Sequence, residues 1–539
     1  MKWMDTLRKK VRGWMQSAGA ATGIAREFKD IFEVGGVPAF NQFYYFGIFI
    51  WKWIYKGYYK AWHLVPSPTI LNQNATRTMA HMNTGKAVCA ELASLVFGDC
   101  VQINVTREGW NSEDPDPLGE FVTDVLRRNA FSTKMQEHCE QALALGGGAI
   151  KVWFEPRRNE QGAIIPGEGD MRIGYAMADQ FVPTAWDNAR VTEGVFISRV
   201  AKDGYYYTRL EWHKWNGTTY VITNELYRAD MEKGERPDTT QDILGIRVPL
   251  SDVYPMLAEE TTFKGLEQSL FTYYRTPIAN NLDDNSPLGV SMYANALDTL
   301  RSIDTVYDSL LREFRLGKKR IIVPYNAVRT VVDPQTGTSI RYFDANCEAY
   351  EALNTDNPDQ LKVVDNSMEL RVEEHVAALN AYLNILCLQT GLSLNTFSFT
   401  TGGGMKTATE VVSENSKTYK TVKTVQHQIR PAVEALVNGI ITVASLYDVK
   451  WQGQSVAAMA AGGYDVSITF DDGVTQDRQT NINEGMALVG QGILSKYTFL
   501  TDPKYGQGLT PEQARQELER IKSEQGGRIE ALDILNSAE

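Results

Sequence analysis

Cysteine and histidine are scarce in this 539-residue chain, and neither follows a pattern of known chemistry. The five cysteines include no CxxC spacing, and the six histidines include no HExxH pair. The sequence therefore predicts no metal site. An odd number of cysteines without an export signal also favours a reducing cytoplasm.

Basic residues are in deficit as well. Lysine and arginine total 54 against 66 acids, which gives a formal net charge of −12. This is the wrong sign for a protein that grips nucleic acid through its phosphates, so we expect any DNA contact to be loose or confined to a small patch. Hydrophobic residues make up 43% of the chain, enough for a folded interior divided over about three regions.

Long hydrophobic runs are missing too. The aromatic segment from Phe43 to Trp53 is interrupted at Lys52, short of the roughly 20 residues that span a bilayer. Helical spacing relates Trp51, Ile54, Tyr55, Tyr58 and Trp62. This spacing favours a buried or subunit-facing helix. A peripheral membrane protein that uses residues 43–62 is the alternative.

The first half of the chain alternates helix and strand patterns. Residues 68–98 and 115–145 have helical patterns, and Val101–Val105 is expected to be a strand. We interpret the three glycines 146–148 as a helix end that turns into a strand, because no helix follows them as it would in a nucleotide loop.

Short β segments follow from Met171 to Val248 and predict an antiparallel platform. Asn216-Gly217 is expected to join two of its strands as a hairpin. Asp283 and Asp284 resemble a catalytic carboxylate pair, but their setting among Asn, Pro and Gly is typical of turn residues.

Two long helices bracket a β-rich insert in the middle of the chain. Apolar residues recur every three or four positions over 293–317 and again over 368–392, and charged residues such as Asp304 and Asp308 occupy the other faces of the first helix. The basic cluster Lys318, Lys319 and Arg320 begins the insert. It provides either favourable charge at a helix end or a docking point for a partner.

A glycine-rich segment after the second helix resembles a phosphate-binding loop. The consensus requires glycine before the lysine, but Met405 precedes Lys406, and Thr400 stands where the outer glycine belongs. Despite these departures, an ATP-binding enzyme built on Lys406 and Thr407 is the second alternative. Its acid-bearing strand would be 466–470, whose alternating pattern indicates a half-exposed antiparallel strand and not the buried parallel strand of such enzymes.

Residues 407–446 predict a third long helix with a kink at Pro431. Its first half is rich in serine and threonine. That composition suits a helix that lies against copies of itself or faces a water-filled channel.

Several strings, in this order, resemble the SPP1-like (Gp6-like) family of tailed-phage portal proteins. They are Ile54-Tyr-Lys-Gly57, KAVCAELASLVF at 86–97, ALGGGAIK at 144–151, SPLGVSMY at 286–293, DTVYD at 304–308 and KTATEVVS at 406–413. The resemblance is collinear over most of the chain.

This resemblance implies an α+β portal fold with eight regions. They are a wing at 1–290 with an N-terminal arm at 1–62, a first stem helix at 291–317, a β-rich clip at 318–367, a second stem helix at 368–392, a tunnel loop at 393–406, a spine helix at 407–446, a wing return strand at 447–475 and a helical crown at 476–539.

The function implied by the resemblance is that of a head-tail connector and not of an enzyme. A dodecameric ring at one vertex of the virion capsid would pass double-stranded DNA, without sequence preference, during packaging and ejection. Its expected partners are the major capsid protein, scaffold, terminase and a head-completion adaptor, with assembly in the host cytoplasm and no cofactor or membrane. The residues expected at the channel are Asn395, Thr396, Phe397, Ser398, Phe399, Thr400, Thr401, Gly402, Gly403, Gly404, Met405 and Lys406. Lys318, Lys319 and Arg320 are the expected docking residues of the clip.

Overall fold

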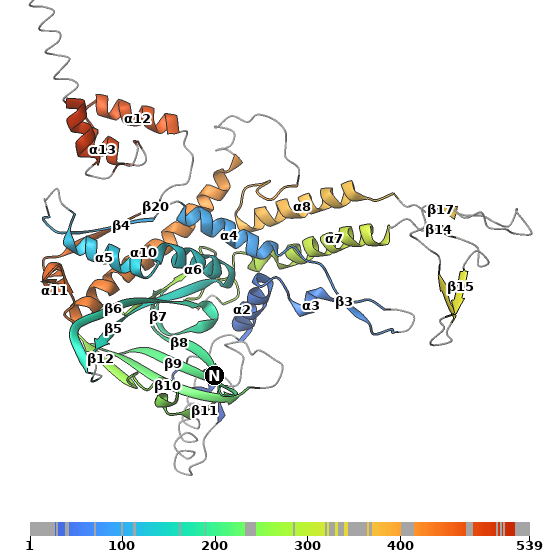
Figure 1. Cartoon of the computed structure of the whole chain (residues 1–539), viewed down its shortest axis with the longest axis horizontal. Coiled ribbons are helices and arrows are strands. Elements are labelled where there is room, and N and C mark those ends of the chain that lie inside the picture. The colour runs from blue at the N-terminus through green and yellow to red at the C-terminus, as the bar shows by residue number, and fades with distance from the viewer. Residues whose placement is uncertain are drawn as a thin grey trace, which may run out of the picture.

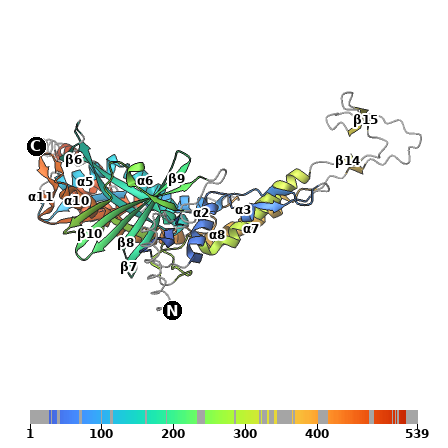
Figure 2. The same ribbon diagram turned by 90° about the horizontal axis from the view of Figure 1, so that it is seen from below.

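A body of sheets and helices carries a two-helix stalk in the computed structural model (Figure 1). The described residues are 27–28, 31–37, 42–68, 72–98, 101–110, 115–159, 161, 163–188, 190–231, 244–283, 286–317, 321–322, 329–332, 339–342, 364–365, 369–399, 414–470, 478–502, 505–506, 509 and 513–522. Figure 2 shows the stalk projecting from the body in a second view.

Two antiparallel sheets form much of the body. The larger is a seven-stranded sheet in the order β1-β11-β10-β9-β8-β7, with β12 also paired to β10. Its strands are β1 (Glu27–Phe28), β7 (Phe181–Asp187), β8 (Arg190–Lys202), β9 (Tyr205–Asn216), β10 (Thr219–Asp230), β11 (Gly245–Val248) and β12 (Glu260–Lys264). The smaller sheet has the order β13-β5-β6. Its strands are β5 (Gly147–Arg158), β6 (Ile164–Met177) and β13 (Phe271–Arg275).

The predicted platform is therefore confirmed in type but divided in two. Asn216 pairs with Thr219, so the hairpin between β9 and β10 lies where the sequence predicts it. In contrast, β6 leaves the platform and pairs with β5 along most of its length.

Four helices pack against these strands and against one another. α6 (Phe131–Leu145) and α10 (Ser416–Leu446) lie against β5, α4 (Thr84–Phe97) lies against α6 and α10, and α2 (Gln42–Tyr55) packs on α4 and α6. The inner face of α2 is fully buried, with Tyr44, Ile48 and Trp51 at most 2% exposed. The interpretation of the aromatic segment as a buried helix is confirmed up to Tyr55. Trp62 belongs to the separate helix α3 (Lys60–His63).

Two of the predicted helices are divided or shortened. Over 68–98 the helix begins only at Thr84, because Thr76–Thr78 forms β3 and pairs with β2 (Leu64–Pro66). Over 115–145 the chain forms α5 (Pro117–Arg128) and then α6, separated by Ala130 with a φ of 49°.

Asn129 explains the break between α5 and α6. Its side-chain amide donates to Val125 O at 2.8 Å and to Met171 O at 2.9 Å, and its carbonyl accepts from Ile173 N at 3.1 Å. The side chain thus ends α5 and joins it to β6. Such side-chain bonds to backbone compete with helix continuation.

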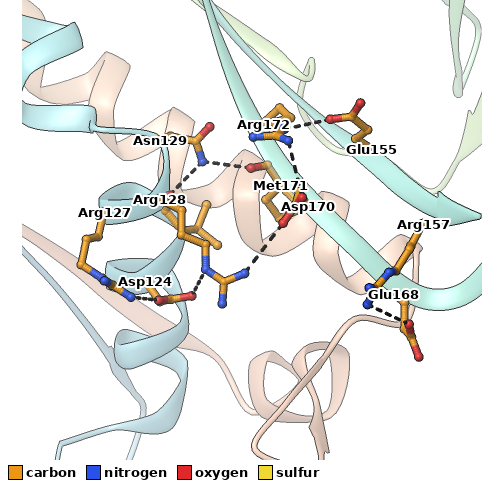
Figure 3. Close-up of polar contacts among 11 residues, drawn as sticks. Asp124, Arg127, Arg128, Asn129, Glu155, Arg157, Glu168, Asp170, Met171 and Arg172 are labelled. Atoms are coloured by element: carbon orange, nitrogen blue, oxygen red, sulfur yellow. Dashed lines mark hydrogen bonds and ion pairs between the residues drawn. The ribbon is translucent and has the colours of Figure 1, made fainter.

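Exposed ion pairs reinforce the same junction (Figure 3). Arg128 lies 2.7 Å from Asp124 on α5 and 3.8 Å from Asp170 on β6, and Arg172 continues the chain of charges to Glu155 on β5 at 2.9 Å. These side chains are roughly half exposed apart from Asp124. Each such pair contributes at most about 1 kcal/mol.

A nearly buried carboxylate joins the two sheets. Glu211 on β9 accepts from Lys151 Nζ of β5 at 2.6 Å, from Arg209 Nη2 at 2.7 Å and from His213 Nε2 at 3.0 Å. His213 Nδ1 lies 2.7 Å from the Tyr220 hydroxyl. Burial raises the pKa of Glu211, but the three surrounding groups outweigh burial and hold that pKa well below its usual range.

His138 of α6 is buried at 3% exposure and is held neutral by its surroundings. Its Nε2 lies 3.0 Å from Ala176 O, which only accepts, so the proton sits on Nε2 and the Tyr274 hydroxyl donates to Nδ1 at 2.8 Å. Burial lowers the pKa of His138 to about 4.

We therefore expect stability to decline as the pH falls below about 6.5. There the unfolded chain takes up a proton that folded His138 refuses until about pH 4. The loss over this window reaches about 3 kcal/mol for this group and is absent above it. Urea unfolding across the window measures the slope. His138→Asn should flatten it, and an unchanged slope would contradict the assignment.

The stalk pairs α7 (Leu297–Leu316) with α8 (Val372–Thr390), and a short 3-10 helix (Ala294–Ala296) precedes α7. Both helices are confirmed close to their predicted bounds. Arg371 donates to Glu313 at 3.1 Å where α8 begins and α7 ends. At the far end lie four short strands: β14 (Ile321–Ile322), β15 (Arg329–Val332), β16 (Ser339–Tyr342) and β17 (Val364–Asp365). Lys318, Lys319 and Arg320 lie outside the described residues.

The chain after α10 returns to the body and then forms small helices. β20 (Tyr464–Phe470) pairs antiparallel with β4 (Val101–Arg107). The remaining elements are β18 (Lys450–Trp451), β19 (Gln454–Ser455), α11 (Val456–Ala460), α12 (Arg478–Gly490), α13 (Lys496–Thr501) and a helical stretch at 513–522. Three more 3-10 turns occupy Ile31–Glu33, Ala178–Gln180 and Leu250–Asp252.

Candidate channel-loop site

The predicted tunnel loop starts where α8 meets α10. α8 ends at Gly391, which has a φ of +81°. Thr421 Oγ1 of α10 donates to Gly391 O at 2.7 Å, and a Cβ on Gly391 would lie only 2.6 Å from that hydroxyl. Both the left-handed backbone and the close approach of α10 therefore require glycine here.

Ser393 and Thr418 lock the next step of the chain by a reciprocal pair of bonds. Ser393 N donates to Thr418 Oγ1 at 2.8 Å, and Thr418 N donates to Ser393 Oγ at 3.2 Å. Both residues are buried, at 2% and 5% exposure. The Ser393 hydroxyl thereby satisfies one of the first backbone N–H groups of α10.

Two asparagines on α8 hold the residues that follow. Asn384 accepts from Asn395 N at 2.8 Å, and Asn380, one turn earlier, accepts from Phe399 N at 3.0 Å. Residues 393–399 thus run back along α8. Asn395 itself has a φ of 62°, in the region that asparagine tolerates better than most residues.

The predicted loop residues fall into two groups. Asn395 to Phe399 lie in this anchored segment, with Phe399 55% exposed. Thr400, Thr401, Gly402, Gly403, Gly404, Met405 and Lys406 lie outside the described residues. The structure therefore describes the base of the loop, and the part with the glycines and Lys406 stays a prediction.

A second polar centre was missed by the sequence analysis. Asp304 and Asp308, predicted on the faces of α7 outside its apolar stripe, are both buried at 7% exposure. Arg77 donates to both oxygens of Asp308 at 2.7 and 2.6 Å, and Ala80 N adds a bond at 3.1 Å. Burial raises the pKa of Asp308, but the bonds from Arg77 and Ala80 outweigh it and lower that pKa overall.

Asp304 fastens the same segment one turn away. It accepts from Met82 N at 2.9 Å and faces His63 Nε2 at 3.1 Å. His63 Nδ1 accepts from Tyr59 N at 2.8 Å, so Nε2 carries the proton and donates to Asp304. Residues 59–82 are thus clamped to α7. The available signal was the spacing of two acids four residues apart, next to the apolar stripe.

The two alternative functions gain no support from the described residues. β20 alternates buried and exposed side chains in a two-stranded antiparallel pair, as predicted and unlike a strand of an ATP-binding parallel sheet. Among the described helices, α10 alone is long and apolar enough to cross a membrane by length and composition. Half of that apolar window is buried inside the protein, where α10 packs on β5, β13 and α4.

The structure thus combines a mixed body, a projecting helix pair and a loop anchored between α8 and α10. The sequence of the chain also matches a known protein family. Residues 52–531 match the family described as phage portal protein, SPP1 Gp6-like. The chain belongs to this family, whose members are structural proteins of the phage virion.

Other comparisons add less. No curated protein matches the chain. Among solved structures, a chain of the "Virion of native gene transfer agent (GTA) particle" is 11% identical, with 77% of this chain and 88% of that chain covered and a TM-score of 0.33. A chain of the "Neck of native GTA particle computed with C12 symmetry" is 13% identical, with 76% and 86% covered and a TM-score of 0.32. Superpositions this loose do not establish a shared fold.

Proposed function

We propose that this chain forms the ring-shaped portal at one vertex of a phage capsid and is the conduit for double-stranded DNA. Family membership supports this reading. The observation that carries it within the structure is the apolar outer face of the stalk. This face has no partner among the described residues of a single copy.

The outer face of α8 is apolar along three turns. Ala377, Ala381, Ile385 and Leu388 share it at spacings of four, four and three residues, and all four are exposed. Ile385 is 43% and Leu388 62% exposed, whereas Leu379 and Leu383 on the opposite face are each 2% exposed. Leu394, at 61% exposure, continues the patch beyond the helix. Exposed apolar stripes of this kind mark protein contacts.

A neighbouring copy in a ring is the occupant we assign to this stripe. Head-to-tail contacts close into rings when the rotation between copies allows it. On this reading the ring is dodecameric and resides in the virion after assembly in the host cytoplasm.

The remaining regions receive roles from the same proposal. The stem is α7 with α8, the clip is the strand-bearing tip, the wing is the body, α10 is the spine, and the crown is the region after 476. Terminase and the head-completion adaptor would dock at the clip through Lys318, Lys319 and Arg320, and capsid protein and scaffold would meet the wing. The tunnel loop would form a nearly uncharged lip that lets DNA pass without gripping it.

Replacing both Ile385 and Leu388 by glutamate is expected to abolish ring formation. Two charges per copy would be buried without partners in the contact, each at a cost of several kcal/mol. Negative-stain images and analytical ultracentrifugation should show rings with a central hole for the unmodified protein and single chains for the variant.

Ser309→Glu on the exposed polar face of α7 is the matched control, and it should leave rings intact. If rings persist in the double variant, α8 does not form the contact between copies. An unmodified protein that stays as single chains at every concentration would overturn the portal assignment.

A further inference from the structure

Aromatic rings form a row on the outer side of α2. Phe46 stacks on Phe49 with ring centroids 6.1 Å apart, and Phe49 meets Trp53 edge-on, also at 6.1 Å. Lys56 ends the row, with its Nζ 4.9 Å from the centroid of the Trp53 ring. The spacings of three, four and three residues place this row on one side of the helix over about 15 Å. We call Phe46, Phe49 and Trp53 the aromatic ladder.

The aromatic ladder faces away from the core of the protein. Phe46 is 47% exposed. Phe49 and Trp53 are partly buried, but they are not among the side chains packed against the core that the described residues form. Burial of the opposite side of α2 fixes the direction in which the ladder points. Adjacent exposed aromatic side chains on one helix are typical of a contact site, whereas an isolated exposed apolar residue needs no explanation.

A segment with a matching apolar side precedes α2 in the sequence, at residues 3–18, outside the described residues. Its apolar members are Trp3, Met4, Leu7, Val11, Trp14, Met15 and Ala18. At about 100° per residue, all seven fall within an arc of roughly 120° on a helix. Outside this arc lie the basic residues Arg8, Lys9, Lys10 and Arg12. The spacing predicts an amphipathic helix, which needs a partner for its apolar side because a short isolated helix is only marginally stable.

The chain joins this segment to the body close to α2. The ring of Phe32 packs edge-on against Tyr45 of α2, with centroids 5.0 Å apart, and Glu27 of β1 lies five residues before Phe32. Five residues span at most about 18 Å, so Glu27 lies within that distance of Phe32. The connection from residue 18 to residue 27 adds a reach of roughly 30 Å. The segment can therefore lie along the ladder of its own chain.

We propose that residues 3–18 form a helix that docks through its apolar side on the aromatic ladder of the same chain. Sixteen residues of helix extend over about 24 Å, close to the roughly 21 Å of the 14 residues of α2. Trp3 and Trp14 would pack against the rings of the ladder, as aromatic pairs do at centroid separations of about 4.5–7 Å. The inference goes beyond the proposed portal function and does not depend on it.

The other partner suited to such a segment is a membrane. Basic amphipathic helices lie on anionic lipid surfaces, with their apolar side in the bilayer and their charges among the headgroups. A membrane anchor would leave the exposed rings of α2 without an explanation. Docking within the chain accounts for both apolar surfaces at once and turns the basic side of the segment to solvent.

Hydrogen–deuterium exchange of the full chain tests the contact. Amides of residues 3–18 should exchange at least about tenfold more slowly than those of a free peptide of the same sequence. Phe46→Ser with Trp53→Ser should abolish this protection. Because both side chains lie on the outer side of α2, the variant should keep its fold, and unchanged slow exchange of the buried helix α6 verifies this in the same experiment.

Met256→Ser with Ile493→Ser is the matched control. These side chains are 72% and 70% exposed, so the variant removes two exposed apolar groups elsewhere on the chain. Residues 3–18 should stay protected in it. Fast exchange of residues 3–18 in the unmodified protein would overturn the proposal. Protection that survives the loss of Phe46 and Trp53, or that is lost equally in both variants, would overturn it as well.

Assembly state and lipid separate the remaining outcomes. Single chains, obtained by dilution or with the Ile385→Glu and Leu388→Glu variant, should keep the protection. Protection found only in rings would place the segment on a neighbouring copy, and protection found only with phosphatidylglycerol vesicles would make it a membrane anchor. Either result would overturn docking within the chain. A protein that forms no rings counts against the portal assignment and leaves this contact measurable.

Discussion

Replacing Gly146 by alanine is expected to destabilise the protein by more than about 3 kcal/mol. Gly146 ends α6 with a φ of 97°, a conformation that alanine adopts only under strain. A Cβ there would also collide with the carbonyl oxygen of Gly289. The three nearest atoms, from Gly289 and Val290, are all backbone atoms, so no side chain can rotate away to make room.

Gly204→Ala provides the matched control for backbone strain. Gly204 has a φ of +81° and nothing within 4 Å of its would-be Cβ, so this variant measures the conformational cost alone, about 1 kcal/mol. Urea unfolding of both variants gives the difference. Equal losses for Gly146→Ala and Gly204→Ala would show that the approach of Gly289 is unimportant.

Glu211→Gln is the second change with a large expected effect, a loss of about 3–5 kcal/mol. Lys151 and Arg209 would keep their charges at 16% and 18% side-chain exposure but lose the carboxylate that neutralises them. Because Lys151 belongs to β5 and Glu211 to β9, the loss also loosens the contact between the two sheets.

Glu155→Gln is the comparison at an exposed ion pair. Arg172 and Glu155 are 45% and 60% exposed, so water replaces their interaction at a cost of at most about 1 kcal/mol. Making Lys151→Met first should shrink the effect of Glu211→Gln, since one stranded charge is removed in advance. A loss at Glu211 no larger than at Glu155 would contradict the buried-pair argument.

Local periodicity predicted the long elements of the fold well. α7 and α8 lie close to their expected ranges, and α10 ends at Leu446 as expected, whereas 407–413 of its predicted range lie outside the described residues. Each helix buries one continuous apolar face, which the spacing of apolar residues reveals. The break between α5 and α6 could not be predicted from the spacing of residues. It depends on Asn129 reaching the backbone of β6 at Met171, a contact across more than forty residues.

The polar sites depended even more on distant partners. Asp304 and Asp308 were placed only outside the apolar stripe of the helix, and charged residues in such positions are usually exposed. Their partners, from His63 to Met82, lie more than two hundred residues earlier in the chain. The position of the tunnel loop came from family resemblance, whereas Ser393 and Thr418, which anchor it, are ordinary polar residues in the sequence.

The clamp on α7 changes the electrostatic character of the stalk. By composition α7 is slightly acidic, with Asp298, Asp304, Asp308 and Glu313 against three arginines. The carboxylates of Asp304 and Asp308 form ion pairs with side chains of the segment 59–82, and Glu313 forms an ion pair with Arg371. Arg301, Arg312 and Arg315 are left facing solvent beside Asp298. A partner approaching the exposed side of α7 would therefore meet three arginines and one aspartate, whereas the adjoining first turn of α8 presents Glu373 and Glu374.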